Sequence, residues 1–239
     1  ALDTLQKRET KAKETGKMTE EQLAKQKANG SESDDTICTA GLTDDEILEG
    51  LNLLLIGDSI AVDVTDDFYE MFPNSVSDTK IGRITSLGKQ VLDSYIDEKK
   101  WEGEGVIFAS LSNSPINGEL EAIREKIGKD MPLFLTTVRI PHDTFEEESN
   151  SKIKKFVEEN DHTYLIDWYA ASEGHDEYFD ADDTHLLSAG AKAYAKCIKE
   201  AVLAAYKKEN IEIPKSRLSS GADTSTDSSN DSSTNASTE

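Results

Sequence analysis

Ser59 has the sequence surroundings of a catalytic nucleophile. It follows the apolar stretch 51–56 and Gly57, a flexible residue that lets the chain turn sharply, and it precedes apolar residues at helical spacing. At the start of a helix, a serine lies among free backbone N–H groups and at the positive end of the helix dipole, which stabilise a nearby anion. That environment suits attack on a substrate that becomes an oxyanion. The alternative is that Asp58 and Ser59 only cap the helix, because both residue types favour the N-cap position.

His185 and Asp182 are the candidate partners of this serine. A serine nucleophile needs a base within hydrogen-bond reach, and the base needs a carboxylate that orients it. Of the four histidines in the sequence, only His185 has an aspartate three residues before it. A tight turn would let Asp182 bind one ring nitrogen and leave the other for Ser59. Because Asp-x-x-His recurs by chance in so acidic a chain, the prediction depends on its combination with the turn at Ser59.

Alternating strands and helices must position these residues. Short apolar runs predict strands, and apolar residues at helical spacing between them predict helices. The expected strands are 51–56, 75–81, 105–111, 132–138 and 163–167, and the expected helices are 60–71, 84–95, 119–127, 145–157 and 187–207. Such alternation indicates a parallel sheet covered by helices on both faces, which binds ligands at the carboxyl ends of its strands. Several polar or small residues lie at or beside those ends: Ser59, Gly82, Asn113, Arg139 and Asp167.

Charge and composition exclude some classes of partner. The 239 residues include 48 acidic and 26 basic ones, a formal net charge of -22. Such a chain repels the phosphates of nucleic acids and of anionic membrane surfaces. No apolar run approaches the ~20 residues that a transmembrane helix needs. Cys38 and Cys197 lack metal-type spacing, which leaves two alternatives open: a disulfide from the segment before the first strand to the last helix, or two free thiols.

Composition divides the chain into three segments. Residues 1–42 are predicted to be a charged spacer, partly helical or disordered, because they show no sustained apolar stripe. Residues 43–210 form the predicted catalytic domain. Residues 211–239, rich in Ser, Thr, Asp and Asn, are predicted to be a disordered tail. The chain begins with a polar stretch and no initiator Met, so we expect it to be a piece of a longer protein.

These motifs together resemble the SGNH (GDSL-type) hydrolase family. That family has Gly-Asp-Ser in its first block, here ending at Ser59, and Asp-x-x-His in its last, here ending at His185. Gly82 matches the glycine of its second block and Asn113 the asparagine of its third. The resemblance implies a flavodoxin-like three-layer α/β/α sandwich with a five-stranded parallel sheet. It also implies an oxyanion hole formed by the backbone N–H groups of Ser59 and Gly82 with the Asn113 side chain.

Within the family, the chain resembles the extracytoplasmic domains of peptidoglycan O-acetyltransferases. The similar stretches are 56–59, 80–83, 138–141, 167–169 and 182–186. This resemblance implies transfer of an acetyl group, through a covalent acetyl-serine, to a hydroxyl of a cell-wall glycan. It implies no metal or organic cofactor, and an acetyl donor delivered by an integral-membrane acyltransferase domain of the same full-length, cell-surface protein. The alternatives are a carbohydrate acetylesterase, which shares the acyl-enzyme, and a wall-binding domain with weakened activity.

The third block departs from the family pattern. Relatives have Gly-x-Asn-Gly or Gly-x-Asn-Asp where this chain has Leu111-Ser112-Asn113-Ser114. Asn117, followed by a glycine, is therefore the alternative oxyanion donor. Three further residues were assigned to substrate binding: Arg139 to meet an acyl donor or glycan, and Trp168 and Tyr178 to wall a sugar groove by stacking. For Arg139 the alternative is a surface ion pair, and for the aromatic residues it is a place in the core.

Overall fold

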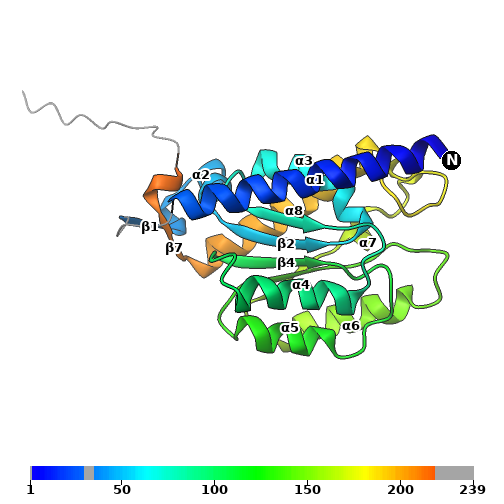
Figure 1. The fold of residues 1–239 in the computed structure, drawn as a ribbon. Coiled ribbons are helices and arrows are strands. Elements are labelled where there is room, and N and C mark those ends of the chain that lie inside the picture. The colour runs from blue at the N-terminus through cyan, green and yellow to red at the C-terminus, as the bar shows by residue number, and fades with distance from the viewer. Residues whose placement is uncertain (1, 30–34, 219–239) are drawn as a thin grey trace, which may run out of the picture.

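A parallel sheet forms the centre of the protein (Figure 1). The structure is a computed structural model that describes residues 2–29 and 35–218. The sheet has five strands in the order β3-β2-β4-β5-β6, each parallel to its neighbours. The strands are β2 (Leu53–Gly57), β3 (Val76–Thr79), β4 (Gly105–Ala109), β5 (Leu133–Thr136) and β6 (Thr163–Ile166). This is the flavodoxin-like strand order, so the predicted fold class is confirmed.

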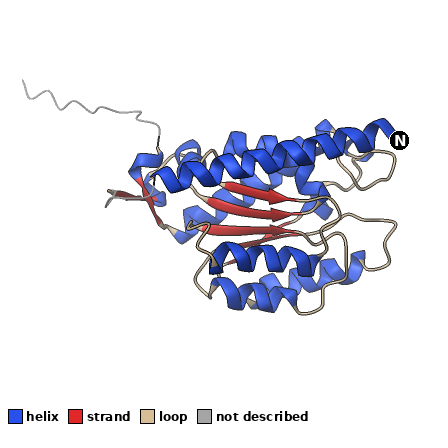
Figure 2. Ribbon diagram, viewed as in Figure 1, coloured by secondary structure: helices blue, strands red, loops and turns tan. Residues whose placement is uncertain are grey.

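Helices cover both faces of the sheet (Figure 2). On one face lie α2 (Asp44–Gly50), α3 (Ser59–Met71) and α8 (Ser188–Glu209), and on the other α4 (Thr85–Asp97), α5 (Glu119–Ile127) and α6 (Glu146–Glu159). Successive side chains of β2 alternate between the two layers: Leu53 and Leu55 pack toward α3 and α8, and Leu54 and Ile56 toward α4 and α5. All four are fully buried, which is why the strand reads as a continuous apolar run.

A second, two-stranded sheet joins residues 36–38 to residues near the carboxyl-terminal end of the described chain. Strand β1 (Thr36–Cys38) pairs antiparallel with β7 (Glu212–Pro214), and two 3-10 turns, η1 (Thr39–Gly41) and η3 (Lys215–Arg217), adjoin them. The folded region is thus wider than the domain limits predicted from composition. Residues 36–42 and 211–218 belong to it, because Ile213 is fully buried against the core. The rest of the predicted tail, 219–239, lies outside the described residues.

Helix α1 (Leu2–Asn29) lies along α3 and the edge strand β3 (Figure 1). Polar side chains dock much of it: the Thr19 hydroxyl donates to the Ser77 carbonyl, and Gln26 Nε2 donates to Asn52 Oδ1 and to the Asn74 carbonyl, each at 3.0 Å. Because these docking side chains are polar, the sequence of the helix shows no sustained apolar stripe. The spacer prediction allowed for a helix here but missed its packing against the domain. None of the described helices is long and apolar enough to cross a membrane.

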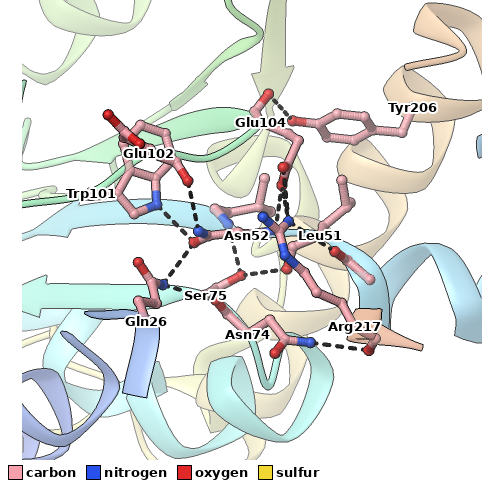
Figure 3. Close-up of polar contacts among 12 residues, drawn as sticks. Gln26, Leu51, Asn52, Asn74, Ser75, Trp101, Glu102, Glu104, Tyr206 and Arg217 are labelled. Atoms are coloured by element: carbon pink, nitrogen blue, oxygen red, sulfur yellow. Dashed lines mark hydrogen bonds and ion pairs between the residues drawn. The ribbon is translucent and has the colours of Figure 1, made fainter. Parts of the chain in front are cut away.

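A polar network closes the end of the sheet opposite the carboxyl ends of the strands (Figure 3). The Glu104 carboxylate accepts from the Asn52 backbone N–H at 2.7 Å and from Arg217 Nη1 at 2.8 Å with both oxygens. The Tyr206 hydroxyl donates to the Glu104 carbonyl at 2.7 Å, and the Trp101 indole donates to Asn52 Oδ1 at 2.8 Å. Burial raises the pKa of Glu104, and the Arg217 guanidinium opposes that rise. Arg217 therefore holds the carboxyl-terminal segment to the sheet.

The two cysteines are free thiols in this structure. Cys38 is exposed on β1, and Cys197 is half-buried on α8, where burial raises the pKa of its thiol. Of the two alternatives left open by the sequence, the structure contains the free thiols.

We expect Arg217→Ala to lower the free energy of unfolding by roughly 2–3 kcal/mol, because it leaves the largely buried Glu104 carboxylate without its cation. Urea denaturation of the two proteins measures the difference. Lys207→Ala is the matched control, since Lys207 pairs with Asp44 while both side chains are about half exposed, and its removal should cost less than about 1 kcal/mol. Equal losses in the two variants would contradict the role given to the Arg217 pair.

Candidate active site

A sharp turn between β2 and α3 places Ser59 in the first turn of the helix. Gly57 ends the strand, and a Cβ at this position would lie 2.2 Å from the Ala61 Cβ, so only glycine fits so close to the helix. Asp58 caps the helix, because its Oδ1 accepts the Ile60 backbone N–H at 3.1 Å. The Ser59 hydroxyl is not used as a cap. Asp58 is therefore the residue that caps the helix, and the Ser59 hydroxyl stays available for other contacts.

The Asp58 carboxylate also holds the loop after β4. Its second oxygen accepts from the Ser112 backbone N–H at 3.1 Å and from the Ser112 hydroxyl at 2.5 Å. Asp58 is fully buried, and burial raises its pKa while these hydrogen bonds oppose the rise. One carboxylate thus connects the end of β2, the start of α3 and the β4–α5 loop.

Ser59, His185 and Asp182 form a continuous hydrogen-bonded chain. Ser59 Oγ lies 2.9 Å from His185 Nε2, and Asp182 Oδ2 lies 2.7 Å from His185 Nδ1. The Ser59 side chain comes from α3 and the other two from the loop before α8, 126 residues away in sequence. This geometry lets a ring nitrogen take the serine proton while the carboxylate fixes the tautomer of the ring. The structure therefore brings together the three residues predicted to be catalytic, and their catalytic role stays a prediction.

The turn 182–185 lets Asp182 reach back to the ring. Asp182 Oδ1 accepts the backbone N–H groups of Thr184 at 3.1 Å and His185 at 2.9 Å, and Asp183 adopts a left-handed conformation with φ +55°. Partial burial disfavours the charged form of Asp182. The hydrogen bonds from the His185 backbone and ring and from Thr184 outweigh that effect and lower its pKa to about 2. The carboxylate is thus ionised wherever the serine chemistry would run.

Gly82 lies in the turn between β3 and α4, with a positive φ of 68°. The next residue, Arg83, is buried and fixes this turn. Its Nη1 donates to the Gly57 carbonyl at 3.0 Å, and its Nη2 donates to Asp78 Oδ1 at 2.6 Å. Tyr95 donates to the other Asp78 oxygen at 3.0 Å. Arg83 therefore ties the turn that carries Gly82 to the turn that carries Ser59.

Asn113 and Asn117 are both exposed on the β4–α5 loop. Asn113 directly follows Ser112, which Asp58 anchors, and its side-chain amide lies 3.4 Å from the Ser112 hydroxyl. Asn117 lies further along, where its backbone N–H donates to Glu119 at 2.5 Å. Ser114, one of the departures from the family pattern, accepts the Thr85 backbone N–H at 3.1 Å at the start of α4. The altered residue thus connects this loop to the neighbouring helix.

The residues assigned to substrate binding divide into two groups. Trp168, in α7 (Trp168–Ala171), is 2% exposed and packs against Tyr194, so its ring is a core residue and cannot wall an open groove. This corrects the expectation for Trp168. Tyr178 is half-buried and stacks on His175. Arg139 lies 5.2 Å above the Phe179 ring, with its Nε buried and without a hydrogen-bond partner among the described residues.

The other three histidines pair with carboxylates, and none of these contacts involves Ser59. His142 contacts Asp183, His162 contacts Glu209, and His175 contacts Glu177. Within 2–29 and 35–218, no cluster of three or more His, Cys, Asp or Glu side chains is arranged to hold a metal ion.

Arg83 and Ser112 are the supporting residues that the sequence analysis did not identify. Each binds a group brought near only by the fold: Arg83 the Gly57 carbonyl, and Ser112 the Asp58 carboxylate. Their only signal in the sequence is position: Arg83 directly follows Gly82, and Ser112 directly follows the predicted strand 105–111.

The low pKa of Asp182 predicts a pH-dependent contribution to stability. Its folded-state pKa of about 2 lies below the ordinary value of 3.8, so the ionised group stabilises the fold above 3.8 and loses that effect as the pH falls through about 2. We expect wild type to exceed Asp182→Asn in unfolding free energy at neutral pH, with a difference that shrinks between those two pH values. Urea denaturation across a pH series measures it. A difference constant down to pH 2 would refute the assignment.

Comparisons with known proteins show which proteins this chain is similar to. No protein-family model matches the chain. O-acetyltransferase OatA of Staphylococcus aureus is 34% identical over 146 residues, which are 61% of this chain and 24% of the relative. The chain therefore spans about a quarter of that relative's length.

Solved structures show the same fold. The C-terminal catalytic domain of peptidoglycan O-acetyltransferase A (OatA) from Streptococcus pneumoniae matches with a TM-score of 0.60 and 21% identity, over 70% of this chain and 99% of that domain. A lipase/acylhydrolase from Enterococcus faecalis matches with a TM-score of 0.52 and 18% identity, over 64% and 96%. The chain is thus homologous to the OatA O-acetyltransferases, and it shares the fold of these solved structures.

Proposed function

We propose that this chain transfers an acetyl group, through a covalent acetyl-Ser59, to a hydroxyl of a cell-wall glycan. The observation that carries the proposal is the hydrogen-bonded chain from Ser59 through His185 to Asp182. Homology to the OatA proteins supports acetyl transfer as the reaction and peptidoglycan as the class of acceptor. The chemistry needs only the side chains described above, with no metal or organic cofactor in any step.

The first half-reaction acylates Ser59. His185 Nε2 takes the hydroxyl proton as Ser59 Oγ attacks the carbonyl carbon of an acetyl ester, and Asp182 stabilises the resulting imidazolium. The tetrahedral intermediate collapses when the bond to the donor oxygen breaks. That oxygen leaves as an alcohol with the proton from His185, and the acetyl group stays on Ser59.

The second half-reaction reverses these proton transfers with a new alcohol. A sugar hydroxyl gives its proton to His185 and attacks the acetyl carbonyl, and Ser59 leaves with the proton that His185 returns. Water in place of the sugar would give free acetate, so the acceptor alone separates a transferase from an esterase. We propose that two exposed apolar side chains favour transfer to the sugar by limiting the water that reaches the acyl-enzyme. They are Ile81, which precedes Gly82, and Leu187, two residues after His185, and they are 39% and 45% exposed.

The oxyanion hole is proposed to consist of the backbone N–H groups of Ser59 and Gly82 with the Asn113 amide. Donors fixed before the reaction stabilise developing charge without reorganising during it. Two of these donors are fixed: Arg83 holds the Gly82 turn to the Gly57 carbonyl, and the helix holds Ser59. The Asn113 backbone is anchored through Ser112.

The setting of this reaction is part of the proposal. We propose that the chain works at the cell surface, outside the cytoplasm, on acetyl groups supplied by an integral-membrane acyltransferase domain of the same full-length protein. The support is the S. aureus relative, of which the matched region is 24%.

Asn113→Ala should lower kcat by roughly 10²-fold or more with little change in KM, because it removes a bond made mainly in the transition state. Steady-state kinetics on a chromogenic acetyl ester measure both constants. Asn117→Ala is the matched control, since Asn117 is an exposed asparagine on the same loop, and its effect should be mild. The reverse pattern would make Asn117 the oxyanion donor and show that the altered loop has been rebuilt.

The transferase proposal predicts acetylated sugar in the presence of an acceptor. The protein is given an acetyl donor with and without a muropeptide or chitooligosaccharide, and mass spectrometry follows acetyl-Ser59, acetylated sugar and free acetate. We expect acceptor-dependent acetylated sugar, and none of the three products above background with folded Ser59→Ala. Free acetate alone at every acceptor concentration would make the protein an esterase with the same three residues. A Ser59→Ala protein as active as wild type would reject serine catalysis altogether.

A further inference from the structure

Arg8 of α1 reaches the loop that carries Asp182 and His185. Its Nη2 lies 3.4 Å from Asp180 Oδ2 in that loop, and its Nε lies 3.8 Å from Asp63 Oδ2 on α3. The Arg8 and Asp63 side chains are each 12% exposed, so these charges are largely removed from water. Figure 1 shows the amino-terminal part of α1 at the same end of the molecule as the yellow loop that follows α7.

Both carboxylates that Arg8 binds belong to residues in contact with the backbone beside the histidine. Asp63 Oδ2 accepts the backbone N–H of Leu186 at 3.2 Å. Asp180 donates its backbone N–H to the His185 carbonyl at 2.8 Å. Arg8 is therefore one residue away from both polar groups of the peptide bond between His185 and Leu186.

The charge balance of this contact depends on Arg8. Burial raises the pKa of Asp63, and the Arg8 guanidinium is the largest of the effects that oppose it. Without Arg8, the Asp63 and Asp180 carboxylates would lose the guanidinium that both of them contact, and like charges at short range repel. Asp63 would then be a weaker acceptor for Leu186, because the proton-free form that accepts best would be less favoured.

The docking of α1 on the sheet edge does not depend on this contact. Thr19 and Gln26 attach the other half of the helix to Ser77 and Asn52, far along the chain from Arg8. The helix is thus held at the sheet edge and presents Arg8 to the loop as a fixed group.

We propose that Arg8 is a positioning residue that holds the 180–187 loop, so that α1 is a working part of the catalytic unit. The proposal rests on the proposed function, because it concerns the placement of His185 for serine acylation. A displaced ring lengthens the Ser59–His185 hydrogen bond, and small misplacements of a base cost large factors in rate.

Three variants test this role in the full chain. Arg8→Ala removes both ion pairs. Arg8→Lys keeps the charge and reaches one carboxylate at a time, since an ammonium is a point charge. Lys11→Ala is the matched control: Lys11 lies three residues further along α1 and pairs with Asp66 on α3, so it loses the same charge from the same helix without touching the loop. Arg8 lines an open cleft of about 390 Å³ between α1, α3 and the start of α8, so its truncation opens no hole in the core.

Two readouts separate positioning from general stability. The first is steady-state kinetics: Arg8→Ala should lower kcat by roughly tenfold or more with KM changed less than about twofold, Arg8→Lys should restore part of the loss, and Lys11→Ala should match wild type. The second is amide hydrogen exchange, in which Arg8→Ala should speed exchange of the Leu186 amide, whose acceptor is Asp63, and leave the β2 and β4 amides unchanged.

The outcomes separate failure of the role given to Arg8 from failure of the proposed function. If wild type shows no Ser59-dependent turnover, the proposed function fails, and the exchange rate of the Leu186 amide still decides whether Arg8 holds the loop. If wild type is active and Arg8→Ala equals Lys11→Ala in kcat and in exchange, Arg8 positions nothing and the inference is overturned. A KM increase alone, with kcat unchanged, would likewise overturn it and give Arg8 a role in substrate binding.

Discussion

The buried carboxylate of Asp58 is the interaction on which the site depends. A fully buried carboxylate is costly unless hydrogen bonds satisfy it, and here the donors come from two separate elements: the first turn of α3 and Ser112 after β4. Satisfying Asp58 therefore fixes the distance between Ser59 and the neighbouring loop. The same turn needs Gly57, whose carbonyl binds Arg83 and so brings in the Gly82 turn. Gly57 and Asp58 thus connect the carboxyl ends of β2, β3 and β4.

The loop that carries His185 is built differently, because no strand of the sheet supports it. It is a tight hairpin in which Phe179 and Leu186 form a single bridge, and Asp180 and His185 are joined by a backbone hydrogen bond of 2.8 Å. Its side chains are held from outside, by His142 at Asp183 and by Arg8 at Asp180. Local bonds shape this hairpin, and contacts from distant elements place it over Ser59.

Fold and catalytic chain were predictable from the sequence for different reasons. The strands of the sheet are buried on both faces, so β2 and β4 stand out as apolar runs, and the order of strands and helices then indicated the parallel sheet. Ser59, Asp182 and His185 were identified because two of them are local to one turn and the third begins a helix after a buried strand. The hydrogen bond between Asp182 and His185 follows their short-range spacing, whereas the one between Ser59 and His185 joins residues 126 positions apart and depends on the fold. The resemblance to a known family supplied Gly82 and Asn113, which spacing alone does not distinguish from ordinary loop residues.

What the sequence did not indicate depends on polar contacts between distant residues. Helix α1 lacks a sustained apolar stripe because Thr19 and Gln26 dock it through hydrogen bonds, and a hydrophobic pattern cannot reveal such docking. The strand pair β1–β7 was missed because each strand has only three residues and a single fully buried side chain, Ile213, between them. Trp168 was assigned to a groove because an aromatic residue after a strand end has the same sequence signature whether it faces solvent or the core.

The acidity of the chain has a local consequence at the His185 hairpin. Asp180, Asp182 and Asp183 lie within four residues of one another, and Asp63 approaches from α3. Four carboxylates so close would push the hairpin apart if none were compensated. Backbone N–H groups bind Asp182 and Asp63, and the guanidinium of Arg8 lies between Asp63 and Asp180. In a protein with so large an excess of acidic residues, the placement of these few donors decides where His185 lies, and one of them comes from a helix that the sequence alone assigns to a spacer.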